Sequence, residues 1–456
     1  MNIIIAGAGE VGYAVAKDLA GEGHNVTLID QDRARLERSM NAIDVIGYCG
    51  NSANLNVLEE AEIHTADVFI AATSGDEINL VSCQFAKKLG AKHTMARIRN
   101  PEYIGRIDTM REIMDLTLAL NPDQVAAEEI ARVLQFPTAS RIERFPDSEF
   151  EIVTVRIPAE SHLHQLSLQD MDRKSSSRVL VCAVERDNTV TIPKGSFVLQ
   201  AGDLVSLTGT PRDLRRFFTS AGAYKRPVRN VMLLGGSRIA VYLTRLLEKT
   251  EVSVTIIEQK PQRAAYLAEI LRGADILCAD GTDTSVLKEA GLSQADGFVA
   301  LTGSDEDNII LSMFADQAGV EKVICKVNDD KFTGLMGSAF QDTTVSPKEL
   351  MAQRIVGCIR ALDQSGQDST MEALYYLLDG RVVATEFVAG PEARCVGKPL
   401  KDLRLRPNVL LPLVIHDKQS SIPNGRTVIC PGDKVVVITT NRDIGMLDEI
   451  LLDQGG

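Results

Sequence analysis

The sequence repeats itself at a nearly constant spacing of about half its 456 residues, and this repeat constrains the fold more than any other feature. Gly7 and Asp30 in the first half match Gly235 and Glu258 in the second, each 228 positions later. Further matches at spacings of 229 and 230 are Thr73–Asn79 with Thr302–Asn308, and Gly202–Asp203 with Gly432–Asp433. A spacing this regular along the whole chain indicates a tandem duplication.

Short β-rich apolar runs alternate with helical stretches in each half. In the first half, the predicted order is a strand at 2–6, a helix at about 10–21, a strand at 25–30 and a helix at 32–40. This alternation is typical of βαβ units around a parallel sheet. We therefore expect an α/β fold in which the first part of each half is a Rossmann-like domain.

The last part of each half has a different pattern, with alternating strands such as Glu151–Val155. It predicts a small mixed α/β domain after each Rossmann-like domain. Long helices beginning at Pro122 and Pro347 should close the Rossmann-like domains. Linkers are expected after them, at Phe136–Arg144 and Asp363–Ser369. The predicted domains are 1–136, 145–225, 229–362 and 370–456.

The segment Gly7-Ala8-Gly9-Glu10-Val11-Gly12 has the pattern G-x-G-x-x-G, follows the first strand and opens a helix. With Asp30 at the end of the next strand, it forms a dinucleotide fingerprint. Gly7 permits the tight turn, Gly9 lets backbone N–H groups approach a pyrophosphate, and Gly12 lets helix and strand pack closely. Asp30 favours NAD over NADP, because it accepts hydrogen bonds from a ribose diol and repels a 2′-phosphate. The alternative is an α/β turn that has lost its ligand.

The second copy, Gly235-Gly236-Ser237-Arg238-Ile239-Ala240, departs from this pattern. Ser237 adds a side chain where the backbone should approach phosphate. Arg238 stands where Glu10 stands in the first copy, and its guanidinium suits the phosphates of ATP or ADP. Glu258 still suits a ribose. The alternative is a degenerate copy that was kept for its fold.

Other matched positions should lie at the same sheet edge as the two loops, where α/β sheets bind ligands. Thr73 and Ser74 follow the fourth strand of the first half, and Thr302 follows that of the second. Arg97 and Arg99 lie at the fifth strand, and Lys326 matches Arg97. The side chains at 97 and 99 share one face of the strand. The alternative for the two arginines is a role in surface salt bridges.

Charge and composition exclude several classes of function. The net charge of −13 argues against general binding to nucleic acid, and also against a redox-sensing transcription regulator. The eight cysteines form no C-x-x-C, and the six histidines form no group with metal-ligand or catalytic spacing. No apolar run reaches about 18 residues, so we expect a cytoplasmic protein. We expect no enzymatic activity; the alternative is an NAD-dependent oxidoreductase with an unrecognised substrate site.

The fingerprint, the repeated domain layout and the Pro-x-Gly…Gly-Asp units together resemble the TrkA family of regulatory subunits of bacterial Trk potassium uptake, over essentially the full chain. The resemblance implies RCK (regulator of potassium conductance) domains that bind NAD(H) or ATP/ADP. It also implies a homo-oligomeric, tetrameric ring, peripheral on the inner face of the membrane, which gates a TrkH- or TrkG-like channel subunit. The binding positions that it implies are Gly7 to Val11, Asp30, Thr73, Ser74, Arg99, Gly235 to Ile239 and Glu258.

Overall fold

The computed structural model contains four sheets, two of them parallel and two antiparallel. It describes residues 1–100, 103, 107–135, 139–145, 148–174, 177–221, 228–248, 250, 252–328, 344–364, 371–378, 381–417, 419–441 and 444–452. The chain divides into two compact units, which we describe separately. One unit joins Met1–Ile130 to two segments of the second half, beginning at Asn230 and Thr344, and holds both parallel sheets. The other holds both antiparallel sheets.

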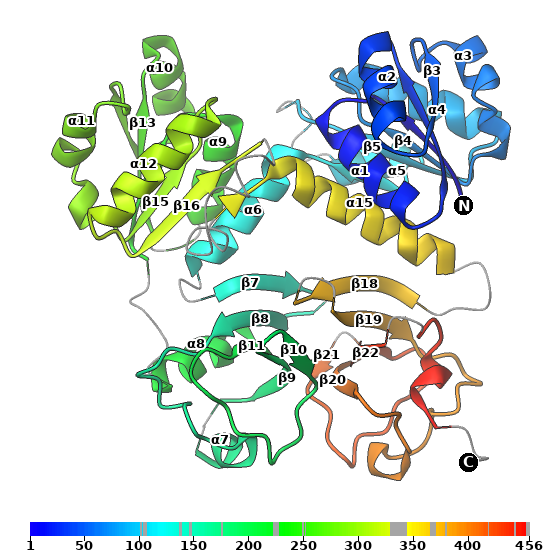
Figure 1. Ribbon diagram of the computed structural model, residues 1–456, viewed down its shortest axis with the longest axis vertical. Helices are drawn as coiled ribbons and strands as arrows, with labels where there is room; N and C mark the ends of the chain where they lie inside the picture. Colours follow the sequence, from blue (N-terminus) through cyan, green and yellow to red (C-terminus); the bar gives the residue numbers. More distant parts are fainter. Residues whose placement is uncertain are drawn as a thin grey trace. The chain divides into compact units, whose positions relative to one another are not determined.

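The first parallel sheet has the strand order β3-β2-β1-β4-β5-β6. Its strands are β1 (Asn2–Ala6), β2 (Asn25–Asp30), β3 (Ile46–Cys49), β4 (Val68–Ala71), β5 (His93–Arg97) and β6 (Leu118–Leu120). Its helices are α1 (Glu10–Gly21), α2 (Arg33–Ala42), α3 (Leu55–Glu60), α4 (Asp76–Leu89), α5 (Ile107–Ile113) and α6 (Pro122–Gln135), with a 3-10 helix η1 at Ile63–Thr65 (Figure 1).

The second parallel sheet repeats this topology strand for strand, in the order β14-β13-β12-β15-β16-β17 (Figure 1). Its strands are β12 (Asn230–Leu234), β13 (Ser253–Glu258), β14 (Ala274–Cys278), β15 (Gly297–Ala300), β16 (Lys322–Lys326) and β17 (Thr344–Val345). Its helices are α9 (Arg238–Leu247), α10 (Pro261–Ile270), α11 (Thr284–Glu289), α12 (Asp305–Gln317) and α15 (Pro347–Gln364), with η3 at Leu292–Gln294. The equal strand orders confirm the predicted duplication of a Rossmann-like fold.

The central strands of the parallel sheets are buried on both faces, as βαβ crossovers require. In β1, the side chains alternate between the two faces of the sheet, and Ile3, Ile4, Ile5 and Ala6 are all buried. Ile4 and Ala6 join the core that includes Leu80 of α4. The uninterrupted apolar run at 2–6 therefore reflects burial on both faces.

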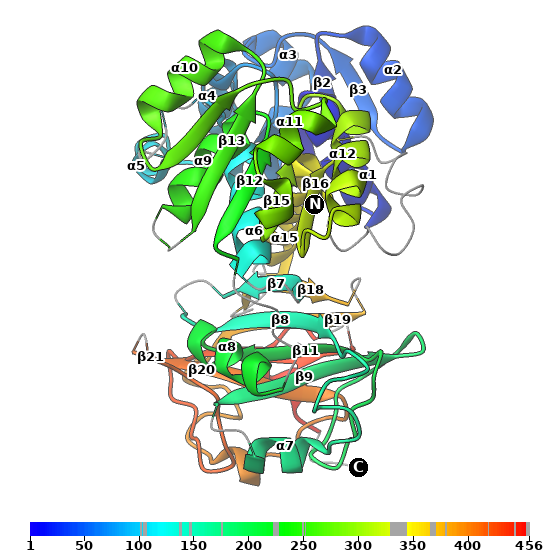
Figure 2. The same cartoon turned by 90° about the vertical axis from the view of Figure 1, so that its left-hand side faces the viewer.

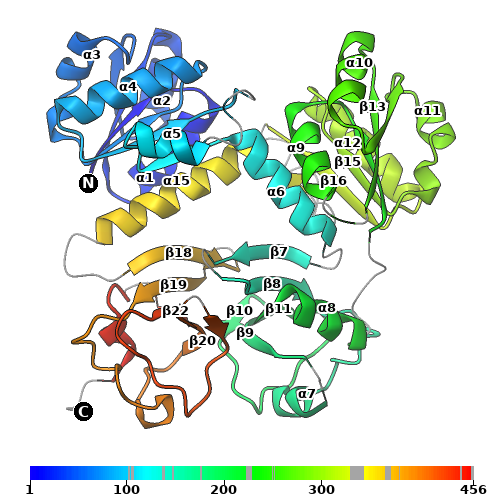
Figure 3. The same ribbon diagram turned by 180° about the vertical axis from the view of Figure 1, so that it is seen from behind.

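The two antiparallel sheets also match each other. The first, in the order β10-β9-β11-β8-β7, consists of β7 (Ala139–Arg144), β8 (Glu151–Arg156), β9 (Val179–Arg186), β10 (Thr189–Thr191) and β11 (Leu204–Gly209), with helices α7 (Leu168–Lys174) and α8 (Pro211–Ser220) (Figure 2). The other, β18-β19-β22-β20-β21, consists of β18 (Met371–Leu377), β19 (Val382–Val388), β20 (Val409–His416), β21 (Gln419–Ser421) and β22 (Lys434–Thr439), with 3-10 helices η4 (Leu400–Asp402) and η5 (Leu447–Ile450) (Figure 3).

The predicted linkers are wrong in part. Within Phe136–Arg144, the residues Ala139–Arg144 form strand β7, which pairs with β8. Strand β7 has one large apolar residue, Ile142, which is buried, and this is too little for a strand pattern at the edge of a sheet. Within Asp363–Ser369, helix α15 continues to Gln364, and 365–369 lie outside the described residues. The domain boundaries stay a prediction. In the part of the chain that is described, no helix is both long and apolar enough to cross a membrane.

Candidate functional site

The first G-x-G-x-x-G loop contains glycines of two kinds. Gly7 has φ +103°, and a Cβ there would lie 2.8 Å from the Ala72 carbonyl oxygen. A Cβ on Gly12 would lie 1.8 Å from the Gly7 carbonyl oxygen. The fold itself therefore requires these two glycines. A Cβ on Gly9, in contrast, would meet nothing within 4 Å. The chain has room for a side chain at Gly9, so its glycine suits the approach of a ligand.

Asp30 holds this loop from the end of β2. The backbone N–H of Ala8 donates to Asp30 Oδ2 at 2.7 Å, and that of Asp32 donates to Oδ1 at 2.8 Å. Each carboxylate oxygen therefore has one hydrogen bond already, and its second lone pair is the one available to a ribose hydroxyl. Asp30 also lines the cavity described next. The fingerprint carboxylate thus has a structural role as well as a place at the site.

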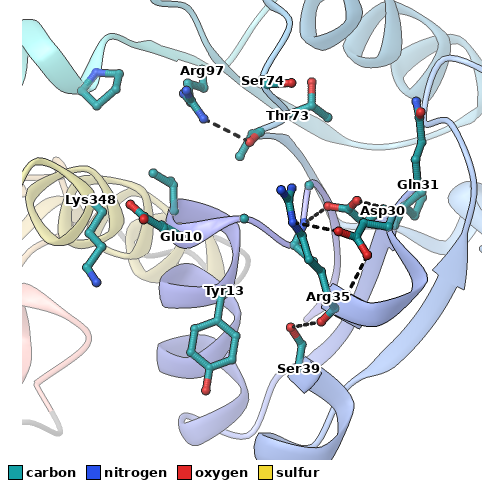
Figure 4. Close-up of a pocket in the computed structure, with 18 of the residues that line it drawn as sticks. Glu10, Tyr13, Asp30, Gln31, Arg35, Ser39, Thr73, Ser74, Arg97 and Lys348 are labelled. Carbon is teal, nitrogen blue, oxygen red and sulfur yellow. Dashed lines mark hydrogen bonds and ion pairs between the residues drawn. The ribbon is translucent and has the colours of Figure 1, made fainter. Parts of the chain in front are cut away.

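A cavity of about 1280 Å³ opens over the first loop and the carboxyl ends of its strands (Figure 4). The predicted site residues that line it are Gly7, Ala8, Gly9, Glu10, Val11, Asp30, Thr73, Ser74, Arg97, Arg99, and from the second copy Ile239 and Lys326. The predicted residues outside its lining are Gly12, Gly235, Gly236, Ser237, Arg238, Glu258 and Thr302. Residues of both copies thus face one cavity, which the sequence did not suggest.

An asparagine holds the end of β4 to the end of β5 in the same way in both copies. Asn79 accepts hydrogen bonds from Thr73, through the backbone N–H at 2.9 Å and the hydroxyl at 2.6 Å, and donates to the Arg97 carbonyl at 2.9 Å. Asn308 makes the same contacts with Thr302 and Lys326. Both threonine hydroxyls are therefore occupied in positioning the sheet edge.

Arg97 places an incompletely paired guanidinium at the cavity. Its Nη1 donates to the Ala72 carbonyl at 3.4 Å, while its Nε is buried and has no hydrogen-bond partner. Burial lowers the pKa of Arg97, and the neighbouring charge of Arg99 adds to this effect. A buried N–H without a partner is costly, and an anionic ligand would relieve that cost.

Arg99 and Arg238 share one carboxylate. Their Nε atoms each lie 3.2 Å from Oδ2 of Asp123, at the start of α6. The salt-bridge alternative for Arg99 is therefore observed, although Arg99 still lines the cavity. Arg238, predicted to face phosphate, is held by Asp123 instead. Next to this contact, the Asn121 side chain donates to the Tyr242 hydroxyl at 2.9 Å.

Several residues that line the cavity were not predicted from the sequence. Arg35, Arg38 and Ser39 line the cavity from α2, and Lys348 lines it from the start of α15 (Figure 4). Positions 35, 38 and 39 lie on one face of a helix that directly follows Asp30. That spacing could have indicated that α2 contributes to the site. No comparable sequence signal exists for Lys348, because it lies in the second half of the chain, far from the first loop in sequence.

The second loop is covered by its own domain. The carboxylate of Glu258 accepts from the N–H groups of Gly236 and Lys260, at 2.9 and 2.8 Å, as Asp30 does in the first copy. Arg263 Nε then donates to the Gly236 carbonyl at 2.7 Å. A Cβ on Gly236 would lie 2.3 Å from Cδ1 of Leu267, so this leucine packs directly on the loop.

The two helices that follow the loops begin differently. The Ser237 hydroxyl accepts from the Ala240 N–H at 3.3 Å and thereby caps α9. Gly9 begins α1 without any side-chain cap. The first turn of α1 therefore presents N–H groups and the positive end of the helix dipole to the cavity, which is an arrangement that suits phosphate.

Comparisons with known proteins agree with the repeated layout. The TrkA-N domain family matches residues 3–117 and 231–347, and the TrkA-C domain family matches 152–222 and 384–452. The chain is 31% identical over 451 residues to a "Trk system potassium uptake protein TrkA homolog" of Archaeoglobus fulgidus, covering 99% of this chain and 100% of that protein. It is 32% identical over 447 residues to homolog 1 of Methanosarcina mazei, covering 96% and 97%.

Solved structures resemble the fold. The GsuK channel matches with a TM-score of 0.65 at 16% identity, over 96% of this chain and 77% of that one. The GsuK channel bound to NAD matches with a TM-score of 0.63 at 15% identity, over 98% and 78%. At these identities, the likeness concerns the fold alone.

Proposed function

Since the chain belongs to the TrkA family, with both domain types present twice, we propose that it is a nucleotide-sensing regulatory subunit of a potassium-uptake system. Its relatives of similar length are named as potassium-uptake proteins of the Trk system. The proposed subunit has a regulatory role and no chemical step of its own.

The observation that carries the proposal is the open, uncapped loop of the first copy. A Cβ on Gly9 would meet no protein atom within 4 Å, and α1 begins without a side-chain cap. Arg97 adds a buried N–H without a partner at the same cavity. Asp30 stands at the end of the neighbouring strand, at the distance in sequence that a dinucleotide fingerprint requires. We therefore assign NAD(H) to the first copy, with the adenosine ribose beside Asp30.

The second copy is proposed as the weaker nucleotide site. ATP or ADP remains its expected ligand, on the argument from Arg238 that the sequence supplied. The packing of Leu267 on Gly236 and the ion pair between Arg238 and Asp123 both oppose binding at this loop. A ligand there has to displace these contacts, so we expect its affinity to be lower than at the first copy.

Nucleotide can regulate only by binding two conformations with different affinity. Asp123 lines the cavity, begins α6 and pairs with arginines of both copies. A phosphate group beside Arg97 and Arg99 would compete with Asp123 for the charge of Arg99. We propose that this competition changes the position of α6. The partner is proposed to be a TrkH- or TrkG-like membrane subunit, bound at the inner face of the membrane by a homo-oligomeric ring.

The sharpest test of the site is Gly9→Ala. The methyl group meets no protein atom within 4 Å, so the chain should fold, and its unfolding temperature without ligand should fall only slightly because alanine is a poorer N-cap than glycine. The same methyl occupies the path of the phosphate, and NADH affinity measured by calorimetry should fall at least about tenfold, or ~1.4 kcal/mol. Gly21→Ala is the matched control, because Gly21 also has open space but lies at the far end of α1. Unchanged NADH affinity in Gly9→Ala would remove the first loop from the proposal.

Two further measurements separate regulation from catalysis. Potassium flux into vesicles that contain a co-purified membrane subunit should change with added NADH or ATP, and should lose this dependence with Gly9→Ala. The absorbance of NADH should stay constant when the full chain is incubated with carbonyl compounds. Protein-dependent oxidation of NADH would favour the oxidoreductase alternative.

A further inference from the structure

The second antiparallel sheet carries a group of metal-binding side chains at one end. His416 ends β20, Asp433 immediately precedes β22, and Cys430 lies three residues before Asp433. Both strands are labelled in Figure 3. One donor atom from each residue lies within 4.8 Å of the others. His416 Nδ1 and Asp433 Oδ1 are 2.5 Å apart. Imidazole, thiolate and carboxylate are the ligand types of zinc.

The first half shows what the same turn looks like without such a group. Arg186, Gln200 and Asp203 occupy the matching positions, each 230 residues earlier. Arg186 makes two hydrogen bonds to Asp203, both 2.7 Å long, and the Gln200 N–H donates to Asp203 Oδ2 at 2.8 Å. A permanent guanidinium thus balances a buried carboxylate.

The second half keeps the turn and the carboxylate but loses the guanidinium. The Cys430 N–H donates to Asp433 Oδ2 at 2.8 Å, as Gln200 does to Asp203. Asp433 is only 3% exposed. In the described part of the chain, the ion pair recorded for it is with His416, which carries a charge only when protonated. Both positions that differ from the first half, 416 and 430, hold residue types that can bind a metal ion.

We propose that His416, Cys430 and Asp433 bind a divalent transition-metal ion of the zinc type, which replaces the guanidinium charge of the first half. The ion would bind Cys430 as the thiolate and offset the buried charge of Asp433. Ligand atoms around tetrahedral zinc lie about 3.3–3.8 Å apart, given bond lengths of about 2.0–2.3 Å. His416 has to move away from Asp433 by about 1 Å to reach this geometry, and its side chain, 58% exposed, has room to do so. Water, or the neighbouring Asp417, completes the coordination.

The test uses the full chain, freed of metal with a chelator and titrated with zinc and with cobalt. The expected result is one more bound zinc per chain than in the double variant His416→Arg with Cys430→Gln. Cobalt should produce a thiolate charge-transfer absorption in the wild type only. The double variant recreates the arginine–aspartate pair of the first half, so it should fold and keep its unfolding temperature without metal.

Two single variants keep the test decisive. Cys430→Ser should lose the cobalt–thiolate band and weaken zinc binding more than about a hundredfold, which exceeds the loss of about 10- to 100-fold that is typical for a residue behind the ligands. Cys278→Ser, at an exposed cysteine in β14, should change neither signal. If wild type and Cys430→Ser bind zinc equally, or if cobalt gives no thiolate band, the proposal is wrong.

Discussion

The two glycine-rich loops have the same backbone hydrogen bonds and different surroundings. Asp30 and Glu258 each accept from the loop and from the residue two positions further on. The second loop is covered by Leu267, which is fully buried and packs on Gly236. The matching residue of the first copy, 228 positions earlier, is Ser39, which lines the cavity and whose hydroxyl donates to the Arg35 carbonyl of its own helix. A large side chain in the second copy thus corresponds to a small one in the first.

Charge is reversed between the copies as well. Glu10 and Lys348 line the cavity at positions that match Arg238 and Asp123. The helix that follows the loop begins with the acidic Glu10 in the first copy and with the basic Arg238 in the second. Arg238 and Asp123 form an ion pair, so the second loop helix contributes to contacts with the first copy. The duplication has thus kept one fold, while the charges and packing around its two loops differ.

The largest effect is expected from giving the first copy the second copy's leucine. In Ser39→Leu, the larger side chain is added at a position that lines the cavity and should take up space that the ligand needs, so NADH affinity should fall about a hundredfold, or ~2.7 kcal/mol. Calorimetry on the full chain measures this loss. Ser39→Ala is the control and should change affinity less than about threefold. If Ser39→Leu still binds NADH tightly, a leucine at this position does not block a loop, and Leu267 would then not be what closes the second loop.

The next effect concerns Asp30. Asp30→Ala removes a charged acceptor and should weaken NADH binding by roughly 1–3 kcal/mol. The wild type should bind NADH more tightly than NADPH, and the variant should lose this difference because the repulsion of a 2′-phosphate is gone. Since Asp30 also holds Ala8 and Asp32, Asp30→Asn is needed as a second variant that keeps one acceptor oxygen. Equal titration curves for NADH and NADPH on the wild type would contradict the assignment.

Much of the fold follows from the sequence, because local pattern and burial agree in the Rossmann-like domains. The spacing from Gly7 to Asp30 and the repeat at 228 positions predict a Rossmann-like parallel sheet in each half, and both sheets are observed. Strand β7 was missed, because an edge strand with one large apolar residue has little pattern. The composition of the cavity was also missed, since it depends on contacts between the halves. No feature near Arg238 indicates that Asp123, 115 positions earlier, is its partner.

Charge exchange at the two loop helices should have a smaller effect. Glu10→Arg should raise the ATP-to-NADH affinity ratio severalfold, because a triphosphate carries more negative charge than a dinucleotide. Arg238→Glu should lower this ratio, and should also weaken contacts to Asp123. Calorimetry at fixed salt concentration is required, because screening reduces such effects. If neither variant moves the ratio, the charge reversal has no part in ligand choice.

The smallest expected effect is on stability, at the end of the parallel sheets opposite the loops. There the first copy has an ion pair whose basic residue is replaced in the second copy. Asp67 accepts from the Asn2 N–H at 2.8 Å and pairs with Lys92 at 2.8 Å, whereas Glu321 occupies the position of Lys92 in the second copy. The hydrogen bond from Lys92 lowers the pKa of Asp67. A lowered folded-state pKa gives stability that is present above the unfolded pKa of about 3.9 and is lost as pH falls through the folded value.

Asp67→Asn should therefore destabilise the first Rossmann-like domain near neutral pH, and the difference from wild type should shrink as the solution becomes acidic. Because the Lys92 side chain is 70% exposed, the loss should stay below about 1 kcal/mol and decrease with salt. Hydrogen exchange at the amides of β1 and β4 measures it in the full chain without requiring two-state unfolding. Lys92→Met should reproduce the loss, and combining it with Asp67→Asn should add little. A loss that persists unchanged at pH 3 would show that the backbone hydrogen bond from Asn2, and not the pair with Lys92, is the source of the stability.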